Sequence, residues 1–218
     1  MHGFNQGENK KDQEFFFEKI SSPFFGNSTS HIIFKKSKKY IRGSVLDVGA
    51  GDGSLIKIIP QSIGIDIAPN GKDVRKGDIT NLNFSDDFFD TVFAIEVLEH
   101  LNDLELSSAL SEVGRVLSRG GIFIITVPYE EKLEESYVRC PECGTKFHKV
   151  LHQRSFNENS IRKILELNNF NILKIESIPI GTISRHFLLY YLSIFWKILN
   201  IKPTQFFIVA ENIKKQNE

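Results

Sequence analysis

Residues 45–54 read VLDVGAGDGS, and this stretch decides the fold. The apolar run 45–48 predicts a buried strand, and glycines follow it at positions 49, 51 and 53. Glycine lets the backbone turn sharply and lets a ligand approach without a Cβ atom in between. Because α/β sheets bind ligands where their parallel strands end, the stretch predicts a ligand-binding loop at a strand end.

Short apolar strands alternate with helices along the rest of the chain. We expect strands at 44–49, 62–68, 73–78, 91–97, 122–127, 170–178 and 205–211, and helices at 28–41, 54–59, 103–117, 157–167 and 184–200. Such alternation requires parallel units with right-handed crossovers. The sequence therefore predicts an α/β, doubly wound, seven-stranded, mostly parallel sheet with an antiparallel last strand and helices on both faces.

The length of 218 residues favours a single domain, 1–218. We divide it into four parts: an N-terminal helical cap (1–41), a cofactor-binding core (42–128), a Cys/His insertion acting as a lid (129–156), and a C-terminal sheet extension with an apolar helix (157–218).

Charge and composition exclude several classes of protein. The 27 basic residues balance the 27 acidic ones, so the chain lacks the overall positive charge that binds nucleic acid nonspecifically. The first residues are polar and contain no apolar signal segment, and the two cysteines do not form a secreted disulfide framework. We therefore expect a cytoplasmic protein with a small-molecule substrate and no nucleic-acid partner.

Three aspartates follow or end predicted strands near the glycine loop. Asp47 would repel the pyrophosphate of a dinucleotide and attract an ammonium group. Asp66 stands where an acidic residue meets ribose hydroxyls, and Asp78 offers an acceptor for an exocyclic amine beside the apolar Ile79. A nicotinamide cofactor is further disfavoured because Ser54 replaces the expected glycine or alanine.

Four segments together resemble the class I S-adenosylmethionine-dependent methyltransferases of type 11/23. They are, in family order and spacing, VLDVGAGDGSL, GIDIAPN, KGDITNLNFSDDFFDTVFAIEVLEHL and LSRGGIFIITVP. The resemblance is strong over roughly residues 40–130 and loose over roughly 150–213. It implies a Rossmann-like fold and S-adenosylmethionine as the cofactor.

The resemblance also implies roles for individual residues. Gly49, Ala50 and Gly51 would face the methionine part of the cofactor. Asp47 would lie near its amino group, and Asp66 would bind the ribose hydroxyls. A strand-end aspartate is also common as a simple turn cap.

The same resemblance assigns the adenine side of the cofactor. Asp78 would accept a hydrogen bond from the adenine amine, with Ile67 and Ile79 against the ring. Glu96 would lie under the cofactor near the substrate entrance.

The segment EVLEH places Glu96, Glu99 and His100 at i, i+3 and i+4, on one face of a helical turn. It resembles the same segment in quinone-precursor O-methyltransferases and small-RNA terminal methyltransferases. This implies a divalent metal beside the accepting hydroxyl, with His100 as a candidate catalytic residue and His152 completing the site. In many relatives the acids instead place the cofactor and cap a loop.

The stretch RCPECGTKFHKVLH, 139–152, holds both cysteines of the chain. Its C-x2-C-x4-H-x3-H spacing supplies four zinc ligands: Cys140, Cys143, His148 and His152. A complete set leaves no open position for chemistry, so such zinc would be structural and would fold a lid over the substrate side. A redox pair or an unliganded polar loop are the alternatives.

His152 has a second interpretation. The segment HQRSF, 152–156, resembles the stretch that leads into the next helix in many of these methyltransferases. Zinc would then take the other three ligands and a further group, and His152 would face the substrate as a general base.

The predicted helix at 184–200 is apolar and aromatic almost all round. Residues 186–200 would be buried in the protein, or would contact a lipid surface or a long apolar substrate. The function we expect is O-methylation of a glycan, lipid-linked or quinone-type intermediate. The alternative is a non-catalytic cofactor-binding fold whose zinc knuckle contacts RNA or protein.

Overall fold

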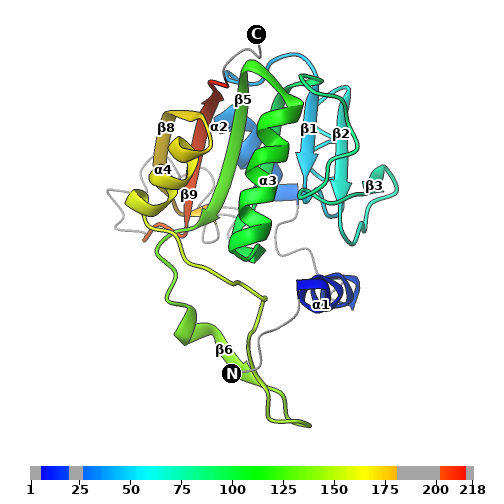
Figure 1. The fold of residues 1–218 in the computed structure, drawn as a ribbon, viewed down its shortest axis with the longest axis vertical. Helices are drawn as coiled ribbons and strands as arrows, with labels where there is room; N and C mark the ends of the chain where they lie inside the picture. The colour runs from blue at the N-terminus through cyan, green and yellow to red at the C-terminus, as the bar shows by residue number, and fades with distance from the viewer. Residues whose placement is uncertain (1–5, 20–26, 181–201, 215–218) are drawn as a thin grey trace.

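The computed structural model describes residues 6–19, 27–180 and 202–214. A seven-stranded sheet forms the centre, with strand order β3-β2-β1-β4-β5-β9-β8 (Figure 1). Its strands are β1 (Val45–Val48), β2 (Ser62–Asp66), β3 (Val74–Lys76), β4 (Phe89–Ile95), β5 (Leu117–Pro128), β8 (Phe170–Ile178) and β9 (Gln205–Asn212). A separate two-stranded sheet pairs β6 (Tyr137–Arg139) with β7 (Lys146–His148).

Strand direction confirms the predicted fold class. The β1 strand pairs in parallel with β2 and β4, β2 with β3, and β4 with β5. The last strand, β9, lies between β5 and β8 and is antiparallel to both. Strand order reverses beside β1, so the ends of β1 and β4 form the switch point where doubly wound sheets bind ligands.

Helices cover both faces of the sheet, as expected. The helical segments are α1 (Gln6–Lys19), α2 (Asn27–Ser37), η1 (Leu98–His100), α3 (Asp103–Val116), η2 (Leu133–Ser136) and α4 (Glu158–Leu167). In Figure 1, α3 and α4 lie on one face of the sheet and α2 lies on the other.

Alternation along the central strands creates a core on each face. Val92 and Ala94 of β4 are fully buried with Leu110 of α3, whereas Phe93 between them is buried with Ile33 of α2. Successive strand residues point to opposite faces, which is why the central strands are apolar at nearly every position. The sheet is thus a rigid platform between two apolar layers.

Asparagine caps fix the starts of two predicted helices. The Asn102 side chain accepts from the backbone amides of Leu104 and Glu105, and Glu105 bonds back to the Asn102 amide. Asn157 caps α4 in the same way, with Ser160 as its reciprocal partner. Each capping box satisfies amides at the helix start that have no partner within the helix. Both helices therefore begin within one residue of the predicted positions.

The predicted helix at 54–59 is wrong. The chain there forms turns, with two isolated helical hydrogen bonds, from the Lys57 amide to the Gly53 carbonyl at 3.1 Å and from the Ile59 amide to the Leu55 carbonyl at 3.2 Å. Only six residues separate Gly53 from Pro60, too few to offset the cost of helix nucleation before proline ends the run.

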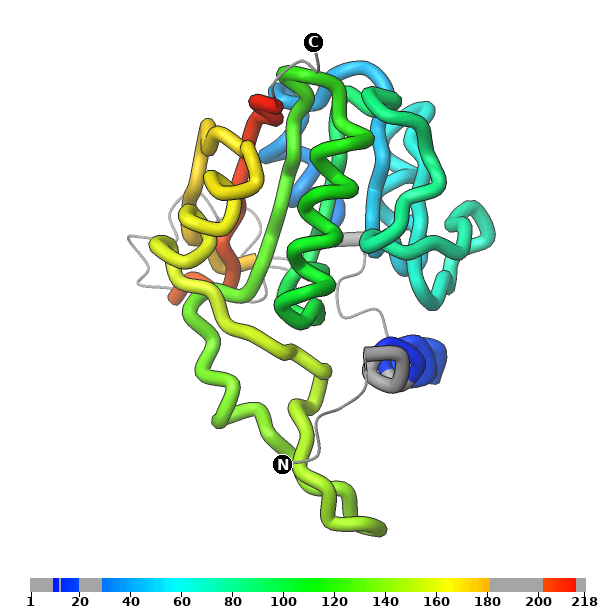
Figure 2. The backbone as a smooth tube through the Cα atoms, viewed as in Figure 1, coloured from blue at the N-terminus to red at the C-terminus, as the bar shows by residue number. Residues whose placement is uncertain are grey.

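Two elements lie off the carboxyl end of the main sheet. The helix α1 and the β6–β7 hairpin both extend beyond the ends of β1 and β5 (Figures 1 and 2). The predicted apolar helix at 184–200 falls wholly within 181–201, outside the described residues. In the part of the chain that is described, no helix has the length and apolar character needed to cross a bilayer.

Candidate active site

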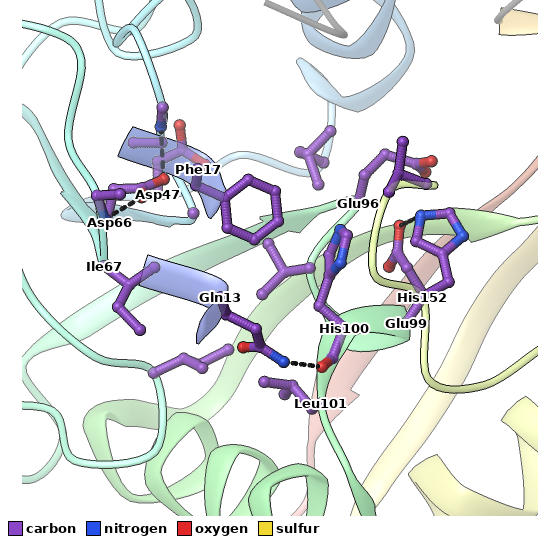
Figure 3. A pocket seen from close by; sticks show the side chains of 18 of the residues that line it. Gln13, Phe17, Asp47, Asp66, Ile67, Glu96, Glu99, His100, Leu101 and His152 are labelled. Atoms are coloured by element: carbon purple, nitrogen blue, oxygen red, sulfur yellow. Dashed lines mark hydrogen bonds and ion pairs between the residues drawn. The ribbon is translucent and has the colours of Figure 1, made fainter. Parts of the chain in front are cut away.

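A cavity of about 910 Å³ opens at the carboxyl ends of β1, β2 and β4. One side is formed by the glycine loop with Asp47 and Asp66, and the other by Glu96, Glu99, His100 and His152 (Figure 3). The ring of Phe17, from α1, lies between the two groups. Every predicted cofactor-binding residue lines this cavity: Asp47, Gly49, Ala50, Gly51, Asp66, Ile67, Asp78, Ile79 and Glu96.

The glycine loop is held by backbone geometry that needs glycine. Gly49 has φ +73° and Gly51 has φ +52°, both in the left-handed region. A Cβ on Gly49 would lie 2.3 Å from Val97 Cγ2, whereas a Cβ on Gly51 would meet nothing within 4 Å. The first glycine is therefore required for packing, and the second leaves space on the cavity side.

Asp66 ties the second strand to this loop. Its two carboxylate oxygens accept from the amides of Gly51 and Ala68, both at 2.8 Å. Each oxygen keeps a second lone pair for a ligand hydroxyl. The arrangement suits the expected ribose contact, which stays a prediction.

Asp47 is an aspartate buried without a cation. Its side chain is 3% exposed, and burial raises its pKa to about 8, with further contributions from the negative charges of Asp66 and Asp52. A buried carboxyl of this kind favours an arriving positive charge. The amino group of the expected cofactor would supply one.

Asp78 already has partners in this structure. Its Oδ1 accepts from the amide and hydroxyl of Thr80 at 2.9 and 2.8 Å, which is the turn-cap role. Its other oxygen forms an ion pair with Lys10 of α1. The ammonium of Lys10 thus lies at the carboxylate oxygen that an adenine amine would contact, so the two groups would compete for it.

Glu96 adopts a rare backbone conformation at the end of β4. Its φ is +56°, which costs energy for a residue with a side chain and is concentrated at functional sites. Burial raises its pKa to about 7. The expected helical face of Glu96, Glu99 and His100 is wrong, because η1 begins only at Leu98 and Glu96 precedes it.

Glu99, His100 and His152 form a buried acid–histidine cluster. Both carboxylate oxygens of Glu99 are buried and accept no hydrogen bond from the described residues, and the same holds for His100 Nδ1. His152 Nε2 lies 4.0 Å from Glu99 Oε1, and the rings of His100 and His152 are 4.8 Å apart. Each of the three residues can direct one ligand atom to a common point, with these atoms within 4.8 Å of one another.

Burial dominates the protonation of this cluster. It raises the pKa of Glu99 well above its ordinary value, with help from the charge of Glu96. It lowers the pKa of His100 to about 3, so that ring is neutral at pH 7. One carboxylate and two imidazoles are a donor set that suits a divalent transition metal. Glu96 is not part of this group.

The predicted zinc set is not brought together. Cys140 and Cys143 lie in the turn of the β6–β7 hairpin, and Cys143 is exposed. His148 pairs with Tyr137 at the base of the hairpin. Tyr137 is three residues along the strand from Cys140, which is about 10 Å at the usual rise per residue. Among the described residues, no group of three ligand atoms within 4.8 Å includes a thiol.

Several residues of the site carry no signal in the sequence. Gln13 donates to the His100 carbonyl at 2.7 Å, and the Phe17 ring meets the His100 ring edge-on at 5.1 Å. Glu131 belongs to a charged run that is typical of a solvated loop, yet it contacts His148 and His152. Only the folded chain brings these residues to the cavity.

Comparison with known proteins agrees with this geometry. Residues 46–125 match a family described as a methyltransferase domain. An uncharacterized protein of Methanocaldococcus jannaschii is 38% identical over 92 residues, covering 38% of this chain. The tRNA (carboxymethyluridine(34)-5-O)-methyltransferase of Arabidopsis thaliana is 32% identical over 103 residues, covering 42% of this chain. The matched stretches make up 36% and 26% of those relatives.

Among solved structures, an S-adenosylmethionine-dependent methyltransferase from Archaeoglobus fulgidus shares the fold, with a TM-score of 0.60 and 20% identity. The similarity covers 90% of this chain and 98% of that one. The segment matched by the family, 46–125, contains the glycine loop and ends within β5. Residues 46–125 therefore form a methyltransferase domain by this match, within a fold that the chain shares with S-adenosylmethionine-dependent methyltransferases.

Proposed function

We propose that this protein transfers the methyl group of S-adenosylmethionine to a hydroxyl of a small-molecule acceptor. One observation carries the proposal: a single cavity is lined by both the glycine loop and the acid–histidine cluster. A cofactor held by the loop would present its sulfonium toward the side where Glu99, His100 and His152 lie (Figure 3).

The reaction needs a base for the hydroxyl proton and an in-line approach of the acceptor oxygen to the methyl carbon. It needs no covalent intermediate with the enzyme. The acceptor oxygen attacks the methyl carbon, the carbon–sulfur bond breaks, and S-adenosylhomocysteine leaves. His152 Nε2 takes the hydroxyl proton as general base. The remaining acceleration comes from holding the two reactants in line within one cavity. His100, neutral at pH 7, shapes the site or acts as a ligand.

A divalent metal at the cluster is the alternative to the general-base role, because both would use His152 Nε2. Glu99, His100 and His152 would hold the metal, and the buried oxygens of Glu99, which accept no hydrogen bond from the described residues, support this. Such a metal would lower the pKa of the accepting hydroxyl. Metal analysis of the purified protein, before and after dialysis against a chelator, tests this part separately.

The lining favours an acceptor with an apolar or aromatic body. Phe17, Val97, Leu101 and Tyr129 line the cavity beside the polar cluster. Pockets of this kind hold an apolar group by contact and orient it with few polar groups. Phenolic quinone precursors and lipid-linked sugars are the acceptors to test first. The Arabidopsis relative, by its name an O-methyltransferase of tRNA, adds RNA as a comparison substrate.

The alternative, a non-catalytic fold with a knuckle for RNA or protein, has weaker support. The two cysteines of the knuckle do not join its histidines, which lie in a candidate metal group with Glu131, and the overall charge is balanced. A buried cluster facing a cofactor cavity would have no purpose in such a module.

The experiment uses labelled S-adenosylmethionine, the full chain and small-molecule extract fractions, with products identified by mass spectrometry. We expect His152→Asn to lower methylation by about 10²–10⁴-fold without weakening cofactor binding. His31→Asn, on the exposed side of α2, is the matched control. Cofactor binding without any labelled product would favour the non-catalytic alternative, and no cofactor binding would refute both.

A further inference from the structure

Three side chains at the base of the hairpin form a continuous chain of polar contacts. Glu131 Oε2 lies 2.5 Å from His152 Nδ1, and Glu131 Oε1 lies 3.4 Å from His148 Nε2, a contact that is close in distance but does not have the geometry of a hydrogen bond. The two imidazole rings are stacked, with centroids 4.7 Å apart and planes 18° apart. All three are largely withdrawn from solvent, with side chains 2–20% exposed.

The backbone decides which nitrogen of His148 carries its proton. His148 Nδ1 lies 3.1 Å from the amide of His152 and 3.4 Å from the amide of Val150, and so acts as an acceptor. The proton of the neutral ring is then on Nε2, the nitrogen that faces Glu131. Glu131, His148 and His152 also form a group that could hold a metal ion, but a metal at Nε2 would require this nitrogen to lose its proton, and we assign His148 an orienting role instead.

Glu131 in turn decides the tautomer of His152. A carboxylate only accepts hydrogen bonds, so the close contact places the proton of His152 on Nδ1. The lone pair of Nε2 is then free on the side of Glu99, 4.0 Å away.

The backbone around His152 supports the same orientation. The amide of Gln153 donates to the Glu99 carbonyl at 2.8 Å, and Leu151 adopts a left-handed φ of +58°. This fixes the position of His152 on the chain, while Glu131 fixes the ring.

We propose that Glu131, itself oriented by His148, is the positioning residue that holds His152 in the Nδ1-protonated tautomer with Nε2 directed at the acceptor side of the cavity. The catalytic consequence rests on the proposed function, and the tautomer does not. A carboxylate that orients a histidine works in this way whether the histidine acts as a base or binds a metal.

The test is the nitrogen spectrum of histidine-labelled, metal-free protein at pH 8. The wild type should show His152 with a protonated Nδ1 and an unprotonated Nε2. Glu131→Leu should move the proton, at least in part, to Nε2, whereas Glu131→Asp should retain the wild-type tautomer. Glu130→Leu is the control, since Glu130 is exposed and adjacent.

Methylation is the second readout. Glu131→Leu should lower kcat about 10–100-fold, the usual effect of removing an orienting partner, with cofactor affinity unchanged as evidence of an intact fold. A wild-type His152 protonated on Nε2 would overturn the proposal, as would full kcat in Glu131→Leu. The expected tautomer in a protein that methylates nothing would refute the proposed function and leave the positioning role standing.

Discussion

The two sides of the cavity are built in different ways. The cofactor side comes from neighbouring strands: β1, the glycine loop and the end of β2 all fall within residues 45–66. The acid–histidine side takes Glu99 from η1, Glu131 from the loop after β5, and His148 and His152 from the hairpin and beyond. The first side depends on backbone conformation, and the second depends on long-range packing.

From this difference we infer that cofactor binding and the choice of acceptor depend on different parts of the molecule. Parallel strands carry the loop to the same edge of the sheet in any protein with this topology, so the cofactor site follows from the fold. The opposite side depends on loops and an inserted hairpin, which vary more easily than the sheet. We expect changes on the cofactor side to affect all substrates equally, and changes on the other side to select among them.

The largest effect that we expect is on the cofactor side, where Asp47 should make the stability of the protein depend on pH. Its folded pKa of about 8 lies above the ordinary value of 3.8, so the folded state holds a proton that the unfolded state releases. The contribution of this proton to the free energy of unfolding is complete below about pH 4. It is lost as pH rises toward 8, at up to about 1.4 kcal/mol per pH unit. Asp47→Asn should therefore gain stability relative to wild type between pH 5 and 8.

Urea unfolding of the cofactor-free protein at several pH values measures this effect. Asp73→Asn, at an exposed aspartate, is the control and should show no such trend. Equal pH dependence in wild type and Asp47→Asn would mean that the carboxyl is ionised in the folded protein. Cofactor affinity of Asp47→Asn should fall in the same preparation.

Two glycines of one loop give the next test. Gly49→Ala would place a Cβ 2.3 Å from Val97 in a left-handed conformation, and we expect a loss of about 2–4 kcal/mol in stability. Gly51→Ala has space for its Cβ, so it should lose only about 1 kcal/mol. Its cofactor affinity should nevertheless fall at least about tenfold.

Thermal unfolding and titration with S-adenosylmethionine separate the two variants. If Gly51→Ala bound cofactor normally, the space beside Gly51 would not be occupied by ligand. The cofactor side would then be less dependent on backbone approach than we argue.

A smaller effect is expected at the contact between α1 and the cofactor side. Lys10 pairs with Asp78, and an adenine amine would compete for the same carboxylate. Lys10→Gln should raise cofactor affinity a few-fold, because a half-exposed ion pair contributes about 0.2–1 kcal/mol. Lys11→Gln, one residue further and exposed, is the control. Weaker binding by Lys10→Gln would show that Lys10 contacts the cofactor instead.

The smallest effect is expected at the hairpin turn, on the other side of the comparison. Cys140 and Cys143 lie apart from the histidines, so the double substitution to serine should change stability by less than about 0.5 kcal/mol. Metal analysis of both proteins accompanies the unfolding curves. Stoichiometric zinc in wild type that is lost in the double variant would restore the four-ligand prediction.

The sequence predicted the sheet better than it predicted the site. Apolar strand runs and helical periodicity are local signals, and the elements that they predict appear within a few residues; the asparagine caps at 102 and 157 explain why the two helices begin there. The prediction of a helix at 54–59 was wrong because the segment is too short to form one. The apolar pattern of the segment does not reveal this.

The predicted zinc ligands failed for a different reason. Spacing along the chain suggested that Cys140, Cys143, His148 and His152 converge, but the β6–β7 hairpin holds both cysteines in its turn and His148 at its base. The two histidines instead contact Glu131, which precedes the hairpin in the chain. The contact between Glu131 and His148 depends on the pairing of β6 with β7. Contacts of this kind follow from tertiary structure and leave no pattern in the sequence.

The reversed direction of β9 joins the cavity wall to β5 and β8 at once. Ile178 at the end of β8 and Pro128 at the end of β5 both pair with Gln205 at the start of β9, beside the cavity. Because the strand register is set on both flanks of β9, the position of Gln205 in the cavity wall depends on both neighbouring strands. A change in the packing of β8 would therefore shift Gln205 at the cavity, although no cavity residue had been substituted.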